Sequence, residues 1–353
     1  MGSQERVSTV IIGGGQAGLA VGYHLKKRGK DFQILDSRSR IGDSWRLRWD
    51  SLQLFTPARY NALPGMRFPG SPAHFPSKDE VASYLEAYAD RFALPVRSDV
   101  KVERVTSDGK HYTVTANSTV YEADNVVVAT GAFQKPRIPE FASQLAPSVM
   151  HLHSSAYRNP GQLKEGDVLV VGAGNSGAQI ALELAKTRKV YLSGRETGAL
   201  PRKIMGVDIY RFIWPTVLSK TVETKMGQKF QAKAAKGGDP LVGFKLASVE
   251  AAGVERVGKT VGVRDGMPVV EGDRVLKVAN VIWATGFAPD FSFIARPIFH
   301  DDGYPKHHRG VVKDEPGLYF IGLRFLWRIR SHLTGGVGED AAYVSDQIAK
   351  ASR

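Results

Sequence analysis

The chain has 353 residues, 42% of them hydrophobic, and a formal net charge of +13. This length predicts a sizeable core divided between two domains, and the basic surface favours anionic ligands. The absence of cysteine excludes disulfides, thiolate metal sites and thiol nucleophiles. No stretch resembles a membrane helix, a signal peptide or a nucleic-acid-binding motif. We therefore expect a cytoplasmic protein with no stable membrane anchor and no nucleic-acid partner.

Residues 8–36 predict a strand, a tight turn, a helix and a second strand. The turn carries G-x-G-x-x-G spacing at Gly13, Gly15 and Gly18. Gly13 permits the tight turn, Gly15 permits the close approach of a pyrophosphate, and Gly18 permits the helix to pack closely on the strand. The helix start attracts phosphate, and Asp36 can accept hydrogen bonds from a ribose 2′-OH. The segment predicts a dinucleotide site, with an ordinary strand–helix turn as the alternative.

The loop that follows, at residues 37–65, is rich in glycine, proline and aromatic residues. Trp45 in this loop either walls off a cofactor ring or packs as a buried side chain. A helix is predicted over residues 77–92, where Ser77 and Glu80 form a capping box. The hydrophobic face of this helix consists of Val81, Tyr84, Leu85 and Tyr88.

Residues 100–106 and 112–120 alternate hydrophobic and polar side chains on either side of an Asp-Gly pair, which predicts a hairpin or small meander. The continuous hydrophobic run at residues 125–129 predicts a strand buried on both faces. This strand ends in small residues that permit close backbone approach, Ala129, Thr130 and Gly131. The same ending recurs at Ala284, Thr285 and Gly286.

Residues 167–195 repeat the first unit, with glycines of the same spacing at Gly172, Gly174 and Gly177. Arg195 lies 23 positions after the first of these glycines, as Asp36 does in the first unit. Two units in register predict two dinucleotide sites. Pro136, Pro139 and Pro289 predict linkers between the domains.

Residues 199–238 hold eight Lys or Arg against two acids. A basic amphipathic helix is predicted from a hydrophobic residue at every fourth position and a neighbouring ladder of lysines: Leu218, Val222, Met226 and Phe230, with Lys225, Lys229 and Lys233. Packing at a domain interface, closing over a cofactor cleft and binding a membrane surface are the alternatives for this helix.

The C-terminal region predicts a last strand over residues 317–322 and a helix from about residue 335 to Lys350. Its glycine-rich start offers a further anion site. His307 and His308 are adjacent, and because neighbouring side chains rarely point at one metal ion we interpret them as a surface loop. No metal site is predicted.

The motifs together resemble the two-dinucleotide-binding-domain flavoproteins, and more narrowly the bacterial flavin-containing monooxygenases of class B. The segments that carry the resemblance are GGGQAG at 13–18, GDSW at 42–45, GAGNSG at 172–177 and ATGFAPD at 284–290. His153 and Tyr157 match the end of the family's linker signature, although Pro147 and Val149 replace its phenylalanine and glycine. A tyrosine at the last position is similar to the S- and N-oxygenating members. His153 filling a linker turn is the alternative.

The resemblance implies an α/β fold of two Rossmann-like dinucleotide-binding domains. Residues 1–158 and 289–353 would form an FAD-binding domain. Residues 159–288 would form an inserted NADPH-binding domain, in which 199–250 is an irregular or helical lid-like insertion. The implied function is an FAD- and NADPH-dependent monooxygenase that uses O₂ to oxygenate a soft nucleophile, a sulfide or an amine, through a flavin C4a-hydroperoxide. A flavin-dependent NADPH oxidase or electron-transfer protein is the alternative, and homodimerisation stays open.

Family position assigns FAD contacts to Gly15, Asp36, Trp45 and Thr130, and NADPH contacts to Gly174, Asn175, Ser176 and Arg195. Helix capping is the alternative for Asn175 and Ser176. The complete expected cofactor-binding set is Gly13, Gly15, Gln16, Ala17, Gly18, Asp36, Ser37, Gly42, Trp45, Val102, Ala129, Thr130, Gly131, Gly172, Gly174, Asn175, Ser176, Gly177, Ser193, Arg195, Ala284, Thr285 and Gly286.

The expected reacting face consists of Phe55, Thr56 and Asn175, with the chemistry carried mainly by FAD. An arginine in the place of the ribose-binding acid can pair with a 2′-phosphate, so Arg195 predicts a preference for NADPH over NADH. Ser193 is expected to add a hydroxyl donor and Lys203 a charge from the insertion.

Overall fold

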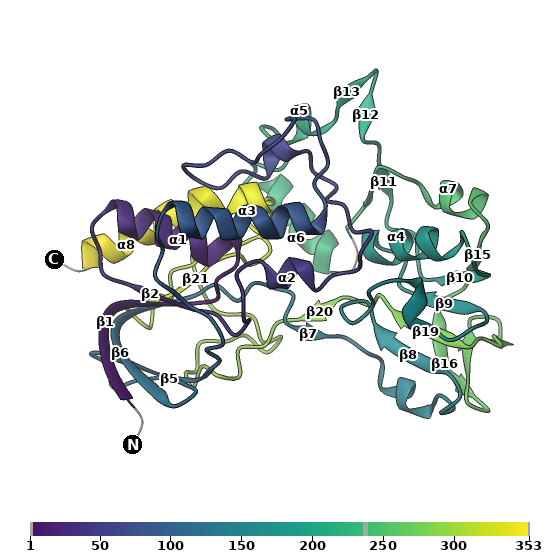
Figure 1. Cartoon of the computed structure of the whole chain (residues 1–353), viewed down its shortest axis with the longest axis horizontal. Helices are drawn as coiled ribbons and strands as arrows, with labels where there is room; N and C mark the ends of the chain where they lie inside the picture. The colour runs from purple at the N-terminus through teal and green to yellow at the C-terminus, as the bar shows by residue number, and fades with distance from the viewer. Residues whose placement is uncertain (1–2, 236–238, 352–353) are drawn as a thin grey trace.

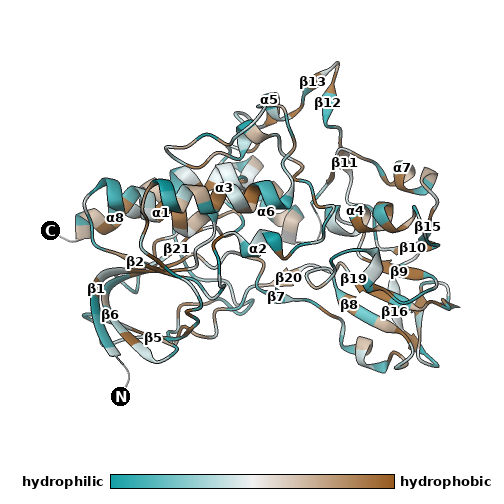
Figure 2. Ribbon diagram, in the orientation of Figure 1, coloured by the Kyte–Doolittle hydropathy of each residue, from teal (hydrophilic) through white to brown (hydrophobic). Residues whose placement is uncertain are grey.

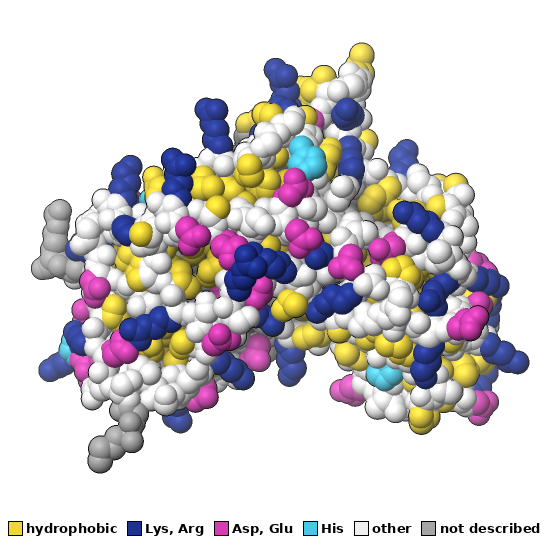
Figure 3. All heavy atoms as spheres, in the orientation of Figure 1, with side chains coloured by type: hydrophobic (Ala, Val, Ile, Leu, Met, Phe, Trp, Pro, Cys, Tyr) yellow, Lys and Arg dark blue, Asp and Glu magenta, His cyan; other side chains and the backbone are white. Residues whose placement is uncertain are grey.

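The computed structural model describes residues 3–235 and 239–351, so residues 236–238 of the predicted insertion lie outside the described residues. The molecule has two lobes, each built on a largely parallel sheet, and both chain ends lie on the first lobe (Figure 1). Lysine and arginine side chains are spread over both lobes on the face drawn in Figure 3. Among the described residues, no helix is long and apolar enough to cross a membrane.

The first sheet has the strand order β3-β2-β1-β6-β5-β4, and β21 pairs with β6. Its centre is parallel, since β1 and β6 run side by side from Ser3 opposite Thr119 to Ile12 opposite Val128. The strands are β1 (Ser3–Ile12), β2 (Gln33–Leu35), β3 (Val96–Arg97), β4 (Val102–Ser107), β5 (Tyr112–Ala116), β6 (Thr119–Val128) and β21 (Leu318–Phe320).

The hairpin around Asp108 and Gly109 is confirmed, but the predicted strand over 112–120 is wrong in its extent. Asn117 adopts a left-handed conformation, with φ of 50°, and its side-chain amide donates to the Asp99 carbonyl oxygen. The chain reverses there, so β5 ends and β6 starts two residues later. Strand β6 then continues without a break into the predicted buried run at 125–129.

The second sheet is parallel throughout, in the order β15-β10-β9-β19-β8. Its strands are β8 (Met150–His153), β9 (Val168–Val171), β10 (Val190–Ser193), β15 (Val254–Val257) and β19 (Asn280–Trp283). A small antiparallel sheet lies beside it, formed by β16 (Thr260–Arg264), β17 (Met267–Val270) and β18 (Arg274–Val275). Because β8 is an edge strand of this second sheet, we propose that the second domain begins just after Pro136 rather than after residue 158.

Helices α1 (Gln16–Lys27), α3 (Lys78–Arg91) and α8 (Val337–Ala351) lie together over the first sheet, and α4 (Asn175–Leu184) and α7 (Leu246–Ala251) lie against the second (Figure 1). Teal stretches on α1, α3 and α8 mark polar surfaces of these helices, and brown along β9 marks a hydrophobic strand of the second sheet (Figure 2). The predicted capping box is confirmed, since the Glu80 amide donates to Ser77 Oγ and the Ser77 amide donates to the Glu80 carboxylate. The predicted C-terminal helix is also confirmed.

The insertion contains β11 (Ala199–Leu200), β12 (Lys203–Ile204), β13 (Val207–Asp208), α5 (Tyr210–Ile213), α6 (Lys225–Ala235) and β14 (Leu241–Val242). The predicted basic helix starts only at Lys225, so Leu218 and Val222 are not part of it. Val222 N instead donates to the Trp327 carbonyl oxygen, in a turn that directly follows a β-bridge between Thr221 and Arg328 of the first lobe. The insertion therefore packs across the domain boundary before α6 begins.

The two linkers between the lobes lie side by side. Strand β7 (Lys135–Pro136) pairs antiparallel with β20 (Phe287–Ala288), and we propose that the segments predicted as linkers at Pro136, Pro139 and Pro289 connect the two domains here. The remaining short elements are α2 (Asp43–Arg46) and the 3₁₀ turns η1 (Ala58–Tyr60), η2 (Glu140–Gln144), η3 (Pro160–Gln162) and η4 (Thr334–Gly336).

Candidate functional site

A cleft of about 2340 Å³ runs between the two lobes and is lined by both glycine turns. All of the expected site residues line this cleft except Gly18 and Gly177. Those two glycines lie behind the turns, where helix and strand meet. Among the described residues, no group of three or more His, Cys, Asp or Glu is placed to hold a metal ion.

The first glycine turn has the geometry of a backbone cradle. Gly13 has φ of +109°, and a Cβ there would lie 2.8 Å from the Ala129 carbonyl oxygen. A Cβ on Gly18 would lie 1.9 Å from the Gly13 carbonyl oxygen. At Gly15, which precedes α1, a Cβ would meet no atom within 4 Å. The turn is thus tightly packed behind and open in front, where the helix start can receive a phosphate.

The second turn repeats this arrangement in the other lobe. Gly172 has φ of +111°, and a Cβ there would lie 2.2 Å from the Ala284 carbonyl oxygen. A Cβ on Gly177 would lie 1.8 Å from the Gly172 carbonyl oxygen, whereas Gly174 faces open space. In both lobes the turn packs against an Ala-Thr-Gly segment, which explains why that segment occurs twice.

The Asp36 carboxylate is fixed by its own backbone neighbours. It accepts hydrogen bonds from the backbone N of Gly14 at 2.5 Å and of Arg38 at 2.8 Å. This carboxylate lines the cleft at the end of β2 with acceptor capacity remaining, as recognition of a ribose hydroxyl requires.

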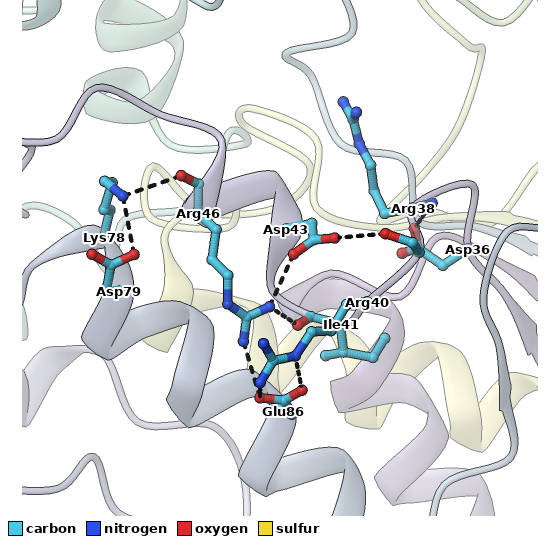
Figure 4. A network of polar contacts seen from close by, with 10 residues as sticks. Asp36, Arg38, Arg40, Ile41, Asp43, Arg46, Lys78, Asp79 and Glu86 are labelled. Carbon is cyan, nitrogen blue, oxygen red and sulfur yellow. Dashed lines mark hydrogen bonds and ion pairs between the residues drawn. The ribbon is translucent and has the colours of Figure 1, made fainter. Parts of the chain in front are cut away.

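The loop after Asp36 is anchored by a charge network (Figure 4). Arg40 and Arg46 both donate to the Glu86 carboxylate on α3. Gly42 has φ of +89°, and a Cβ there would lie 2.6 Å from the Ala82 carbonyl oxygen, so only glycine lets α2 approach α3 this closely. Trp45 is half-buried, so it both packs on the core and lines the cleft.

Three cations lie at the ends of β10 and β15, which are parallel neighbours. Arg195 is exposed and lines the cleft, as do Arg256 and Lys259. Arg256 Nη2 donates to the Gly194 carbonyl oxygen at 2.6 Å, and its Nη1 is buried without a hydrogen-bond partner among the described residues. Sequence reasoning missed Arg256 and Lys259, because only strand pairing brings β15 beside β10.

Two supporting expectations for Arg195 are wrong. Ser193 is fully buried, and its hydroxyl already donates to the Gly258 carbonyl oxygen and accepts from Thr260 N. Lys203 lies on the β12–β13 hairpin and is not among the residues that line the cleft. Neither side chain is available for a phosphate in the cleft.

The expected reacting face is held by hydrogen bonds within the protein. Thr56 Oγ1 donates to Asn61 Oδ1 at 2.8 Å. Asn175 Nδ2 donates to the Pro240 carbonyl oxygen, and its Oδ1 accepts from Val242 N, both at 3.0 Å. These engaged side chains argue against direct catalytic roles, and we propose positioning roles for both residues. Phe55 is half-buried and packs in a hydrophobic cluster shared with the insertion.

His153 and Tyr157 tie the linker to the second lobe. His153 Nε2 donates to the Gly286 carbonyl oxygen, and Nδ1 accepts from Ser155 N. Burial lowers the pKa of His153, so the ring is neutral. Tyr157 is fully buried and donates to the Glu183 carboxylate on α4 at 2.8 Å. These contacts of His153, the last residue of β8, favour a structural interpretation of its motif.

Two further residues in the cleft were not predicted. His332, just before η4, and Arg324 both line it, and Arg324 Nη2 pairs with Asp239 of the insertion at 2.5 Å. Burial lowers the pKa of His332 to about 4. His307 was interpreted as surface loop, but it is half-buried and burial lowers its pKa to about 4, whereas His308 is exposed.

Comparison with known proteins agrees with this geometry. The chain matches the pyridine nucleotide-disulphide oxidoreductase family over residues 10–322. It is 44% identical to an uncharacterized CzcO-like oxidoreductase of Geobacillus kaustophilus, over 98% of this chain and 99% of that protein. It is 30% identical to a probable indole-3-pyruvate monooxygenase, YUCCA1, of Arabidopsis thaliana, over 89% and 84%.

A solved structure extends the likeness to the whole fold. The flavin-containing monooxygenase from Stenotrophomonas maltophilia matches with a TM-score of 0.82 and 26% identity, over 99% of this chain and 100% of that one. The fold of this chain, with its two sheets, thus follows a known architecture. The chain belongs to the pyridine nucleotide-disulphide oxidoreductase family, as a flavoprotein oxidoreductase of the flavin-containing monooxygenase type.

Proposed function

We propose that the protein is an FAD- and NADPH-dependent monooxygenase that oxygenates a sulfide or an amine. The observation that carries this proposal is that two glycine turns of the same geometry line one cleft from opposite lobes. Two dinucleotides can then meet within a single enclosed space, as electron transfer between them requires.

The residues present fit the two cofactors. On the first lobe, Gly15 is open to a pyrophosphate and Asp36 has acceptor capacity for a ribose hydroxyl. On the second lobe, Gly174 is open in the same way, and Arg195, Arg256 and Lys259 supply positive charge for a 2′-phosphate. NADPH fits this second charge pattern better than NADH does.

FAD and NADPH, when bound, supply the redox chemistry and the activation of O₂. The protein's own residues bind, orient and enclose. Asn175 holds the backbone of β14 beside α4, and Thr56 is held by Asn61, so both walls of the cleft are fixed before a ligand arrives. The Arg324–Asp239 ion pair joins the first lobe to the insertion beside the cleft.

The names of the relatives support oxygenation over simple oxidase chemistry. The Arabidopsis relative is named a monooxygenase, and so is the matched solved structure. A flavin-dependent NADPH oxidase or electron-transfer protein is the second candidate, because the same cleft would serve either reaction.

Turnover of the FAD-loaded enzyme separates the two candidates. Purified protein is mixed with NADPH, O₂ and a panel of sulfides, amines and ketones, and both oxygenated product and hydrogen peroxide are measured. We expect oxygenated product from a sulfide or an amine. Hydrogen peroxide alone across the whole panel would contradict the monooxygenase and favour the oxidase.

A further inference from the structure

Three arginines line the cleft on the side of the linkers: Arg38, Arg48 and Arg158. The guanidinium of Arg48 lies 5.5 Å from the ring centroid of Phe287 in linker strand β20, and its Nε donates to the Ser44 carbonyl oxygen at 3.1 Å. Arg158 Nη1 donates to the carbonyl oxygens of Ser155 and Tyr157, at 2.9 and 3.1 Å. Backbone oxygens thus orient both guanidiniums without neutralising them.

These arginines have no acidic partner among the residues that the structure describes, where no carboxylate oxygen lies within 4 Å of any of the three guanidiniums. The same loop shows the contrast. Arg40 and Arg46 are paired with Glu86, whereas the Arg38 guanidinium points away from that network (Figure 4).

The uncompensated charge carries an energetic cost. Arg48 is half-buried. Burial lowers its pKa, and the guanidiniums of Arg38 and Arg158 lower it further. A cation removed from water and repelled by two like charges is unfavourable unless an anion joins it. A planar guanidinium is also the group best suited to a carboxylate or a phosphate.

We propose that Arg48 and Arg158 form an anion subsite at the linker end of the cleft, outside both glycine turns. The subsite holds the carboxylate of an anionic substrate or a phosphate of the nicotinamide cofactor. Arg38 adds positive charge to the same part of the cleft. The identity of the ligand rests on the proposed function, but the subsite itself does not.

Binding to the FAD-loaded protein tests this subsite directly. Arg48→Met keeps an unbranched side chain and removes its charge. Arg48→Lys restores a positive charge without the two-pronged guanidinium. Arg40→Met is the matched control, because Arg40 lines the same cleft but is paired with Glu86. The dissociation constants are measured calorimetrically for NADP⁺, for a thioether that carries a carboxylate and for the methyl ester of that thioether.

We expect Arg48→Met to raise the dissociation constant of one of the two anions by about tenfold or more, which is the effect of losing one charge-assisted hydrogen bond. A loss confined to the carboxylate thioether assigns the subsite to substrate, and a loss confined to NADP⁺ assigns it to cofactor phosphate. Arg48→Lys should recover part of the loss. Unchanged binding of both anions, an equal loss for the ester, or an equal loss in Arg40→Met would overturn the proposal. These binding constants remain informative even if no oxygenated product is ever found.

Discussion

We propose that Arg195 is the main determinant of a preference for NADPH, with Arg256 and Lys259 contributing. The Arg195 side chain is exposed and accessible to a ligand. One charge-assisted hydrogen bond from it to a 2′-phosphate should contribute on the order of 1.5–3 kcal/mol to binding, or about 10- to 150-fold in affinity. Arg195→Gln is therefore expected to raise the KM for NADPH by at least about tenfold and to leave NADH nearly unchanged. Steady-state kinetics with both cofactors checks this, with flavin content as the control.

Arg256 supplies the comparison, because its Nη1 is buried without a partner among the described residues. If Arg195 and Arg256 both contact the 2′-phosphate, Arg256→Gln should also weaken the binding of NADPH more than the binding of NADH. An equal loss with both cofactors in Arg195→Gln would show that the residue does not contact the 2′-phosphate.

Asp340 on α8 is a buried carboxyl whose ionisation opposes folding. Its side chain is 2% exposed, and Arg309 Nε lies 3.8 Å from Oδ1. Burial raises its pKa from 3.8 to about 6, so the folded protein holds this proton more tightly than the unfolded chain does. Stability should therefore fall as pH rises from about 4 to about 6, by at most about 3 kcal/mol.

Asp340→Asn removes this titration. The stability of the variant relative to wild type should improve between pH 4 and pH 7, whatever its offset at pH 4. Urea unfolding at a series of pH values measures that difference. A difference that stays constant with pH would contradict the assignment.

Individual site residues were predictable only where a motif fixed the backbone. Gly13, Gly15 and Asp36 could be placed from the sequence because strand, turn and helix are continuous in the chain. Arg48 and Arg256 could not, because their surroundings come from distant segments. The hydroxyl of Ser193 faces a strand that starts 67 residues later, at Thr260, so no local pattern reveals that it is engaged.

At the scale of elements, the last glycine of each turn controls how closely helix and strand pack. A Cβ on Gly18 or on Gly177 would meet backbone oxygen at less than 2 Å, so neither turn can relax around it cheaply. Gly18→Ala should therefore reduce flavin content, whereas Gly177→Ala should leave flavin bound and weaken NADP⁺ binding. Flavin absorbance and calorimetry distinguish the two variants.

Gly29→Ala is the control for these substitutions, since a Cβ there would meet no atom within 4 Å. Because Gly29 has a positive φ of +63°, we expect Gly29→Ala to lower stability modestly. It should not cause a selective loss of either cofactor. Loss of flavin in both turn variants would mean that the lobes do not bind their cofactors independently.

Elements with strong local signals were predicted well, and those set by tertiary contacts were not. The capping box at Ser77 marked the start of α3 correctly, because both partners lie within one turn. Periodicity at Leu218 and Val222 suggests a helix, but both residues lie in turns, and the backbone between them is hydrogen-bonded to residues 327–330 of the other lobe. Short-range periodicity cannot register such a partner.

At the scale of the molecule, the two lobes share the same arrangement of strand, glycine turn and helix, as the internal repeat in the sequence predicts. The sequence does not show to which sheet an edge strand belongs. Strand β8, for example, is assigned to the second sheet only by the structure. The insertion also contacts the first lobe, through the ion pair of Asp239 with Arg324 and the hydrogen bond from Val222 N to the Trp327 carbonyl oxygen. Residues of both lobes therefore hold the cleft together. Stability and cofactor binding should therefore be coupled across the domain boundary.

Acid stability is a property of the whole molecule, because neutral histidines are buried in several parts of it. Burial lowers the pKa values of His24, His307 and His332 from 6.5 to about 4. Between these values the unfolded chain binds protons that the folded protein does not. The contribution of each histidine is fully present above about pH 6.5 and is lost as pH falls towards 4, by at most about 3 kcal/mol.

Three such groups outweigh the opposite trend of Asp340, so we expect net stability to fall steeply from pH 6.5 to pH 4. His307→Gln should make that fall shallower without changing stability at pH 8 by a comparable amount. Urea unfolding monitored by tryptophan fluorescence at each pH provides the measurement. His308→Gln is the matched control for the substitution, because the His308 side chain is exposed, and His307→Gln should flatten the slope more than His308→Gln does. If the two variants have the same slope as wild type, burial of His307 does not govern its protonation.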